Sequence, residues 1–531
     1  MPPNHKKKKQ RKPKNQHQPH GSEEPQESVE DNDVAGQKSP PEEEEQNNNK
    51  PYVVRHSDVW GRYLIASRNL KAGEVIIQVE PLAVGPWAES DPVCLGCHKT
   101  FEVGAKTVRC PTCNWRICSP TCTGLTTHHS RLECIPLKEY GVAKLLETCS
   151  SATQIKLAYE AILALRCLLQ KRTAPERYAK LLEMDAMNER RQQITSLWKR
   201  NQEAIVQRIR DEWKFEEFSE AEVHTVCGII EVNAFQIGPT EVHARALYPE
   251  AFYIMHDCTP NTTHTDQPGS HELTVRPTRD LKAGEPLTLS YSYTLQGTLK
   301  RRQHLYDSKF FWCQCSRCVD PTEFGTHCST LKCAKCPKGL VLSSNPLDQD
   351  ASWKCKNCPH TIPAQSVTQL LNGLYKELES IGGNNVELFE NFLLKYEPIL
   401  HKNHYLFLSA KHSLCELYGK APNYLMHELT LDQINRKEYL CRDLLTLADS
   451  YEPGLSRLRG QLMYELQAPI MVKSRYLFET QSITLSQLKQ TLKEVKRLLK
   501  QSAEILGFEP PGSADHEMAV AARNALREMG G

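Results

Sequence analysis

The sequence of 531 residues has no long hydrophobic run and almost no net charge. No stretch approaches the roughly 18 to 20 consecutive apolar residues that a membrane-spanning helix needs, and the N-terminus lacks the apolar core of a secretory signal. The net charge is only +2 at pH 7. A near-zero net charge argues against a protein that binds nucleic acid non-specifically by electrostatic attraction. We therefore expect a protein of the cytoplasm, the nucleus or both, without membrane contact.

Cysteine, in contrast, is abundant, with 21 residues that are often arranged in C-x-x-C pairs. Disulfides are rare in reducing compartments, so cysteine pairs at this spacing indicate metal sites, with zinc as the default ion. Isolated cysteines such as Cys149, Cys167 and Cys227 are expected to be small core residues instead.

The first 50 residues carry two blocks of opposite charge and no apolar periodicity. Seven basic residues lie between Lys6 and Lys14, and ten acidic residues lie in 21–50. A segment of this composition buries too little apolar surface to offset the entropy cost of ordering, so we expect a disordered charged tail. The basic run is compatible with a nuclear-import signal or a patch for anionic partners, and a plain solvated tail explains it equally well.

Three groups of cysteines have the spacing of zinc ligands. Seven cysteines and a histidine between residues 94 and 134 supply eight ligands, enough for two ions. Cys258 is followed after 54 residues by a C-x-C-x-x-C run, and together they provide the four thiolates of a closed tetrahedral site. Two further C-x-x-C pairs, separated by 18 residues, predict a small structural zinc ribbon made of Cys333, Cys336, Cys355 and Cys358.

The segment Met255-His-Asp-Cys-Thr-Pro-Asn261, read with Cys313-Gln-Cys315-Ser-Arg-Cys318, resembles the SET domain with its post-SET zinc site, the catalytic unit of protein lysine methyltransferases. The family loop normally reads Asn-His-Ser-Cys-x-Pro-Asn, so this chain departs from it at Met255 and Asp257. The resemblance implies one zinc ion, held by Cys258, Cys313, Cys315 and Cys318, that fixes the segment after Tyr291 onto the His256 loop.

A repeated turn carries the same resemblance. The segment Gly61–Val79 predicts a strand, a turn at Gly73 and a second strand rich in β-branched residues. Arg279-Asp-Leu-Lys-Ala-Gly284-Glu repeats Arg68-Asn-Leu-Lys-Ala-Gly73-Glu almost residue for residue. The first and last parts of a SET domain carry this strand-turn element.

The cysteine cluster at 94–134 resembles the MYND finger, in which ligand pairs interleave. The resemblance implies two zinc ions, one held by Cys94, Cys97, Cys118 and Cys122 and the other by Cys110, Cys113, His129 and Cys134. His128 is an alternative to His129, because the usual finger has three residues between this histidine and the last cysteine, whereas His129 leaves four. MYND fingers generally bind short proline-containing peptides, which implies a protein partner. With the zinc ribbon, the chain is most similar to the arthropod-type branch of the SET and MYND family.

The resemblance also implies the residues of a methyltransferase site. Tyr291, which closes the predicted strand Leu287–Tyr291, matches the catalytic tyrosine, and Phe311 matches an aromatic wall of the lysine pocket. The segment Gly228–Phe235 is expected to re-enter the sheet. Glu183 and Asp185 lie where the family has a cofactor contact, but we do not include them in the site. The residues implied to bind S-adenosyl-L-methionine are Gly61, Arg62, Asn233, Met255, His256, Tyr291 and Phe311.

The expected fold is α+β and multidomain, with a SET-domain β-fold split by a MYND zinc finger and a helical insert. Apolar residues at helical spacing in Leu157–Leu169 and after Ser366 indicate two helical parts, the second resembling tetratricopeptide repeats without a clean 34-residue period. The expected division is a charged tail (1–50), the SET N-terminal part (51–93), the MYND finger (94–134), a helical insert (135–227), the SET catalytic part (228–295), a post-SET zinc region (296–323), a zinc ribbon (324–364) and a helical C-terminal domain (365–531).

The activity implied is methyl transfer from S-adenosylmethionine to a lysine amine of a protein substrate, with Tyr291 orienting the amine and about four zinc ions acting structurally. Such a displacement depends on positioning and on a neutral amine, which a dry aromatic channel favours. The alternative is a catalytically silent scaffold, because Met255 cannot donate the hydrogen bond of the family's asparagine. A zinc-finger DNA-binding regulator is a weak third hypothesis, since neither finger has a basic recognition helix, and nucleic acid is not an expected partner.

Overall fold

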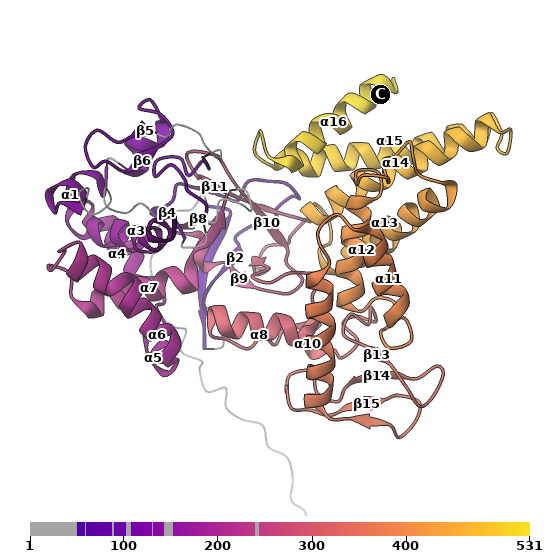
Figure 1. The fold of residues 1–531 in the computed structure, drawn as a ribbon, viewed down its shortest axis with the longest axis horizontal. Coiled ribbons are helices and arrows are strands. Elements are labelled where there is room, and N and C mark those ends of the chain that lie inside the picture. Colours follow the sequence, from indigo (N-terminus) through magenta and orange to yellow (C-terminus); the bar gives the residue numbers. More distant parts are fainter. Residues whose placement is uncertain are drawn as a thin grey trace, which may run out of the picture. The chain divides into compact units, whose positions relative to one another are not determined.

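The structure is a computed structural model that describes residues 50–530 except Val59, 88–89, 102–107, Ser130, 143–151 and 239–243. The tail that we expect to be disordered lies outside the described residues, apart from Lys50, and so does Cys149. The chain from Lys50 onward forms one compact unit, shown in Figure 1. Among the residues described, no helix is long and apolar enough to cross a membrane.

Short strands build the β part of the first 292 residues. Strand β1 (Tyr52–Ser57) pairs antiparallel with β2 (Gly61–Ala66), whereas β3 (Ile77–Val79) pairs with β11 (Leu273–Pro277). The two strands predicted on either side of Gly73 are therefore present but belong to different sheets. The remaining strands here are β4 (Ala83–Pro86), β5 (Val108–Arg109), β6 (Arg116–Ile117), β7 (Phe235–Ile237), β8 (Ala244–Leu247), β9 (Met255–His256), β10 (Thr262–Asp266) and β12 (Thr288–Leu289).

The two copies of the repeated turn, Arg68–Glu74 and Arg279–Glu285, pair with each other and are called the paired turns below. The backbone N–H of Leu70 donates to the carbonyl of Leu281 and the reverse bond is also made, both at 2.9 Å. The side chains cross in the same reciprocal way: Asp280 Oδ1 accepts from Ala72 N and Asn69 Oδ1 accepts from Ala283 N, each at 3.0 Å. The repeat thus joins two segments that are about 210 residues apart.

The expectation that Gly228–Phe235 re-enters the sheet is wrong for its first six residues. They form the last part of helix α7 (Glu220–Asn233), and only Phe235 begins a strand. A capping box between Ser219 and Glu222 starts the helix, and burial of its apolar residues against α3 (Ala152–Thr173) outweighs their β-branching. A Cβ at Gly228 would lie 2.1 Å from the Ala186 carbonyl oxygen, so close packing explains this glycine.

Helices make up most of the rest of the chain (Figure 1). Among the described residues between the cysteine cluster and β7, the other helices are α1 (Cys134–Glu139), α4 (Pro175–Leu182), α5 (Asn188–Gln193) and α6 (Thr195–Asn201), with helical turns at η2 (Gln202–Val206) and η3 (Arg208–Glu212). After β12 come α8 (Thr298–Lys309), α9 (Ser316–Val319) and a four-stranded antiparallel sheet of β13 (Leu331–Lys332), β14 (Leu340–Ser343), β15 (Trp353–Cys355) and β16 (Thr361–Ile362).

The C-terminal helices pack in sequence order, with α13 against α14, α14 against α15, and α15 against α16. Capping boxes begin α13 at Thr430 and α15 at Thr484, which satisfies backbone N–H groups that a helix start leaves unpaired. These helices are α10 (Ala364–Ser380), α11 (Val386–Tyr396), α12 (Tyr405–Leu417), α13 (Leu431–Tyr451), α14 (Arg457–Glu479), α15 (Leu485–Ile505) and α16 (Ala514–Glu528).

Candidate active site and metal centres

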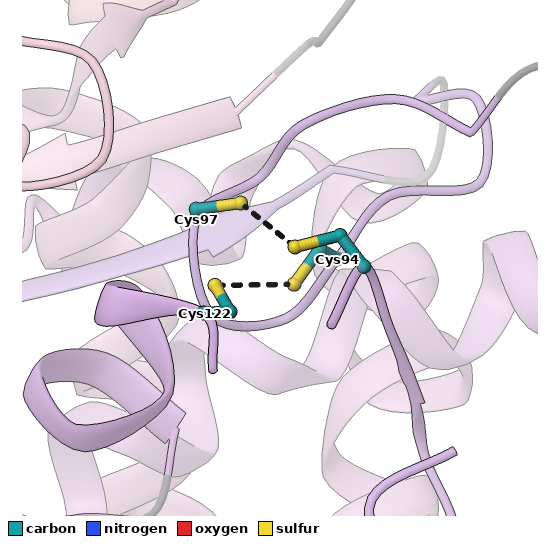
Figure 2. Close-up of side chains that lie close together, drawn as sticks. Cys94, Cys97 and Cys122 are labelled. Atoms are coloured by element: carbon teal, nitrogen blue, oxygen red, sulfur yellow. Dashed lines mark hydrogen bonds between the residues drawn. The ribbon is translucent and has the colours of Figure 1, made fainter. Parts of the chain in front are cut away.

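The structure brings together four groups of ligand atoms, each within 4.8 Å of one another. Figure 2 shows Cys94, Cys97 and Cys122 turned toward a common point. The four groups have the membership that the spacing and the resemblance predicted: Cys94, Cys97, Cys118 and Cys122; Cys110, Cys113, His129 and Cys134; Cys258, Cys313, Cys315 and Cys318; Cys333, Cys336, Cys355 and Cys358.

The sulfur separations suit zinc. Tetrahedral geometry with Zn–S bonds of about 2.3 Å places the sulfur atoms about 3.8 Å apart. The Sγ–Sγ distances recorded here run from 3.5 to 3.9 Å, far longer than the roughly 2.05 Å of a disulfide. Each of the four groups could therefore hold a structural zinc ion with no position left for a substrate.

The choice between His128 and His129 is decided by geometry. His129 Nε2 lies 3.2 Å from Cys113 Sγ, inside the second group, and its Nδ1 lies 2.7 Å from the buried carboxylate of Glu133. A carboxylate behind the second ring nitrogen is the usual way in which a zinc-binding histidine is oriented. His128 instead points its Nε2 at the Gly269 carbonyl, 3.1 Å away.

His256 connects one metal group to the candidate catalytic tyrosine. Its Nδ1 accepts a hydrogen bond from the backbone N–H of Tyr291 at 2.9 Å, and its Nε2 lies 3.2 Å from Cys258 Sγ. A neutral imidazole protonated on Nε2 satisfies both contacts, because it donates to the thiolate and accepts from the amide. Both ring nitrogens are thereby used inside the protein.

Asp257, directly before Cys258, and Asn261, three residues after it, hold the loop in shape. Asp257 Oδ1 accepts from the backbone N–H of Thr259 at 2.7 Å, a local turn that the family's serine would also form, and burial raises the pKa of Asp257. The Asn261 side chain donates to the Pro286 carbonyl at 2.8 Å and accepts from Thr288 N at 2.9 Å. Asn261 therefore fastens the loop to β12, a role that the sequence alone did not assign.

Tyr291 does not lie in a strand. Strand β12 ends at Leu289, and Tyr291 follows in a bend, because the amide of Tyr291 is bound by His256 rather than by a strand. Its hydroxyl donates to the carbonyl of Ile254. Burial raises the pKa of Tyr291 above its ordinary value, so the hydroxyl remains a proton donor at neutral pH.

Phe311 lies on the other side of the same histidine. The ring centroids of His256 and Tyr291 are 5.3 Å apart, and those of His256 and Phe311 are 5.9 Å apart. Phe311 precedes Cys313 of the third metal group by two residues, so the thiolates also fix this aromatic ring. The three side chains form an aromatic cluster beside the Ile254 carbonyl.

Glu183 and Asp185, which we did not include in the predicted site, contact two of the predicted cofactor residues. The Arg62 guanidinium donates to the Glu183 carbonyl, and Asn233 Nδ2 donates to the Asp185 carbonyl at 2.9 Å. Tyr253 Oη donates to Glu183 Oε2 at 3.0 Å and also lies 3.4 Å from Arg62. The segment that contains Glu183 and Asp185 therefore holds Arg62 and Asn233 in place.

Met255 is half-buried, and its strand β9 runs parallel to β12 in register with Thr288. Its thioether can pack against a ligand and accept a weak hydrogen bond, but it has no proton to donate. The remaining predicted cofactor residue, Gly61, has φ +63° and open space where a Cβ would lie, and it begins β2 directly before Arg62. Met255 thus offers no donor where the family has an amide.

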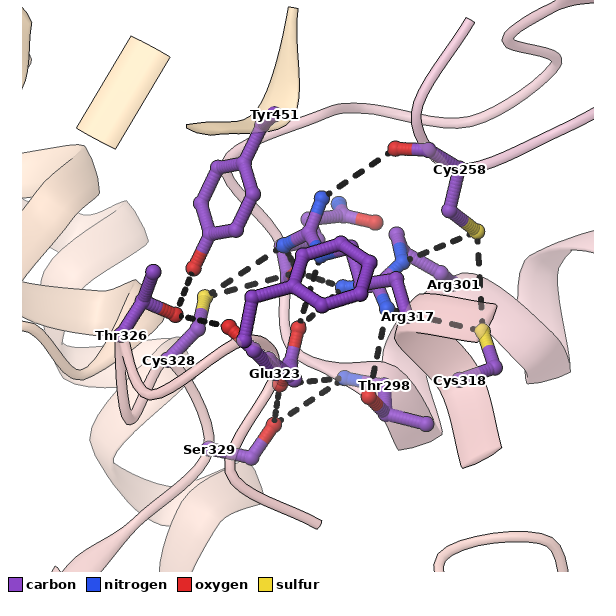
Figure 3. A network of polar contacts seen from close by, with 12 residues as sticks. Cys258, Thr298, Arg301, Arg317, Cys318, Glu323, Thr326, Cys328, Ser329 and Tyr451 are labelled. Atoms are coloured by element: carbon purple, nitrogen blue, oxygen red, sulfur yellow. Dashed lines mark hydrogen bonds and ion pairs between the residues drawn. The ribbon is translucent and has the colours of Figure 1, made fainter. Parts of the chain in front are cut away.

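Next to the third metal group lies a buried charge network that no pattern in the sequence predicted (Figure 3). Arg301 on α8 donates to Cys258 Sγ at 3.2 Å, to Cys318 Sγ at 3.5 Å and to Glu323 Oε2 at 2.8 Å. Arg317 donates to the same carboxylate oxygen at 3.0 Å, and its guanidinium lies 3.5 Å from the ring centroid of Tyr451 on α13. Two cations and one anion therefore surround thiolates that would be negative overall with zinc bound.

Comparison with known proteins places a SET domain in the chain. The SET domain model matches residues 61–292. The chain is 27% identical over 437 residues to "SET domain-containing protein SmydA-8, isoform B" of Drosophila melanogaster, covering 78% of this chain and 90% of that protein. It is 25% identical over 274 residues to "Histone-lysine N-methyltransferase SMYD3" of Mus musculus, covering 49% of this chain and 59% of the relative.

A solved structure, "Crystal structure of the SET domain of LSMT bound to Lysine and AdoHcy", aligns with 12% identity over 90% of this chain and 96% of the other, at a TM-score of 0.26, which is too low to support an argument. The SET model and the Smyd relatives carry the assignment, and the Drosophila relative is consistent with the arthropod-type branch. The chain therefore matches the SET domain over residues 61–292 and is similar over most of its length to Smyd-named proteins of the SET and MYND family.

Proposed function

We propose that this chain is an S-adenosylmethionine-dependent protein-lysine N-methyltransferase of the SET and MYND type. The observation that carries the proposal is the linked arrangement of Tyr291, His256 and Phe311 behind the Cys258 thiolate group. A folding role alone does not require a tyrosine hydroxyl, two further aromatic rings and a metal group to meet at one loop. Methyltransferase names among the relatives support the same reaction class.

The residues at this site fit a sulfonium donor. A methyl group on a positively charged sulfur is attracted by oxygen lone pairs and by aromatic faces. The Tyr291 hydroxyl, the Ile254 carbonyl and the ring of Phe311 supply such groups within one cluster. When bound, S-adenosylmethionine would supply the activated methyl group.

The protein's own contribution is positioning and exclusion of water. His256 fixes the Tyr291 backbone at 2.9 Å, so the hydroxyl is held where it can accept a hydrogen bond from an incoming lysine amine. The aromatic side chains of Tyr291 and Phe311 favour the neutral form of that amine, because desolvation disfavours its charged form. Gly61, Arg62 and Asn233 would bind S-adenosylmethionine. The Glu183–Asp185 segment accepts hydrogen bonds from Arg62 and Asn233 and so fixes their side chains.

Met255 gives the most direct test. The native chain, loaded with zinc, and a Met255→Asn variant would be titrated calorimetrically with S-adenosylmethionine and with its demethylated product. Micromolar binding by the native chain, with several-fold tighter binding by the variant, is expected, since one added hydrogen bond contributes about 0.5–1.5 kcal/mol. Absence of binding by the native chain would remove the proposal.

A catalytically silent scaffold is the second candidate, and the missing donor at Met255 favours it. Asn233 Nδ2 points the same way, since it is already committed to the Asp185 and Ile229 carbonyls, both at 2.9 Å. A scaffold would show no adenosylmethionine binding in the native chain but restored binding in Met255→Asn. The same titration therefore separates the two functions.

The partners and the division of the chain are also part of this proposal. We propose that the substrate is a lysine side chain of a protein, and that the MYND-like segment 94–134 binds a short proline-containing peptide. The domain boundaries given from the sequence are retained, except that the one between residues 227 and 228 falls inside α7 and is better placed after Asn233. Action in the cytoplasm or nucleus accords with the use of cysteines as metal ligands rather than in disulfides.

A further inference from the structure

A cavity of about 210 Å³ lies away from the aromatic cluster, between the second metal group and the segment that leads into β4. Its walls come from the segment that enters β4, from residues next to His129, and from the junction of α3 and α4. This volume is below the about 300–1,000 Å³ typical of sites for larger small molecules. A cavity of this volume has room for one small chemical group but not for a nucleotide.

Three arginines line the cavity: Arg131, Arg166 and Arg177. Arg166 is already neutralised, because its guanidinium donates to both carboxylate oxygens of the buried Glu133, at 2.6 and 3.0 Å. Within the described part of the chain, Arg177 donates to neutral oxygens, namely the side chain of Gln170 and the carbonyls of Pro81 and Leu82. None of these three acceptors carries a charge, and the nearby Glu80 carboxylate offsets the Arg177 charge only in part, because burial and Arg131 together still lower the pKa of Arg177.

Arg131, an exposed residue, is the second cation of the wall that lacks a carboxylate partner among the described residues. Among the described residues neither Arg131 nor Arg177 forms an ion pair with a carboxylate, and Glu80 is the one acidic residue in the wall. Burial lowers the pKa of Arg177, and the neighbouring Arg131 charge lowers it further. Two like charges at one cavity repel each other, and an anion placed between them would remove that cost.

We propose that this cavity binds a phosphate group, either free or carried by a phosphorylated side chain. The planar forks of two guanidinium groups match the oxygens of a phosphate, and Ser270 at the wall offers a hydroxyl. Arg131 and Arg177 contribute two positive charges and Glu80 one negative charge, so a phosphate that carries one or two negative charges brings the sum for these groups from +1 to 0 or −1. The site is independent of the proposed methyl transfer and adjoins the MYND-like segment through Arg131.

The test uses the full zinc-loaded chain at constant ionic strength, titrated calorimetrically with inorganic phosphate and with an acetylated, amidated Ala-phosphoserine-Ala peptide. Arg131→Gln removes one exposed cation of the cavity and should weaken phosphate binding at least tenfold, while Arg131→Lys should retain most of it. Arg172→Gln is the matched control, because Arg172 is an exposed α3 residue outside the cavity wall, and it should bind within twofold of the native chain. Zinc content verifies that each variant keeps its metal groups.

The two probes distinguish the sources. Tighter binding of the phosphopeptide than of inorganic phosphate would assign the cavity to a phosphorylated protein, and the reverse order would assign it to free phosphate. The proposal is overturned if neither probe binds the native chain, or if Arg131→Gln and Arg172→Gln weaken binding equally, since equal loss would reflect only the general charge of the surface.

Discussion

Replacing Arg301 by methionine should selectively release one of the four zinc ions. Methionine keeps much of the side-chain volume but removes the donors to Cys258 Sγ, Cys318 Sγ and Glu323, at 3.2, 3.5 and 2.8 Å. Arg301 is fully buried and Glu323 is 1% exposed, so water cannot replace the lost partner. The thiolates and the carboxylate would then face each other with Arg317 as the only neighbouring cation of the network.

The size of the effect follows from two general magnitudes. Removing one partner of a buried ion pair costs about 3–5 kcal/mol, and removing a group that orients metal ligands lowers metal affinity about 10- to 100-fold. We therefore expect zinc affinity at the Cys258 group to fall by that factor and the urea midpoint of unfolding to drop clearly. The other three groups do not contact Arg301 and should keep their ions.

The assay follows transfer of zinc from the protein to a chromogenic chelator. The native chain should release four equivalents slowly, and Arg301→Met should release one equivalent in a separate, faster phase. Lys300→Met is the control, since Lys300 is the preceding residue of α8 but lies over the Tyr375 ring at 4.6 Å, away from the thiolates. Release of all four ions by Arg301→Met at the native rate would refute the reasoning.

Three further outcomes are expected. Tyr291→Phe removes only the hydroxyl bonded to the Ile254 carbonyl, so methyl transfer should fall about 100-fold or more while calorimetric binding of adenosylmethionine changes less than twofold. Burial lowers the pKa of Lys309 from 10.5 to about 8, so the unfolded chain binds more protons between these values and stability should rise with pH across that window; urea unfolding at two pH values should show this slope in the native chain and not in Lys309→Met. Asn69→Ala and Asp280→Ala each remove one of the two reciprocal 3.0 Å bonds and should each cost about 0.5–1.5 kcal/mol; calorimetric unfolding that shows an effect for only one of them would contradict the reciprocity.

The metal groups could be predicted because cysteine spacing is a local property of the chain. A C-x-x-C pair places two thiolates on one short turn, so only the pairing between turns depends on the fold. The ambiguity between His128 and His129 arose because two adjacent histidines differ only in direction. The Glu133 carboxylate resolves this ambiguity, because it binds and orients His129. Glu133 follows His129 by four residues, so this pairing could also have been recognised in the sequence.

The misassigned segment and the charge network depend on burial, which the sequence does not reveal. Gly228 followed by β-branched residues is typical of a strand, but contact with α3 outweighs that preference. Arg301, Arg317 and Glu323 are three of 130 Lys, Arg, Asp and Glu residues, a total of 66 basic and 64 acidic, and charged residues are usually exposed. Only the fold shows that these three are buried together.

The paired turns have a consequence for how the chain can vary in length. Their reciprocal hydrogen bonds hold Leu70 and Leu281 side by side. The chain segment between these two residues therefore starts and ends at one fixed junction. The entropy cost of closing such a chain segment grows only logarithmically with its length, by about 0.6 kcal/mol for each doubling. Insertion, deletion or exchange within the cysteine-rich and helical segments at 94–233 would therefore leave the junction itself nearly unchanged, and these segments can diversify while the paired turns keep their register.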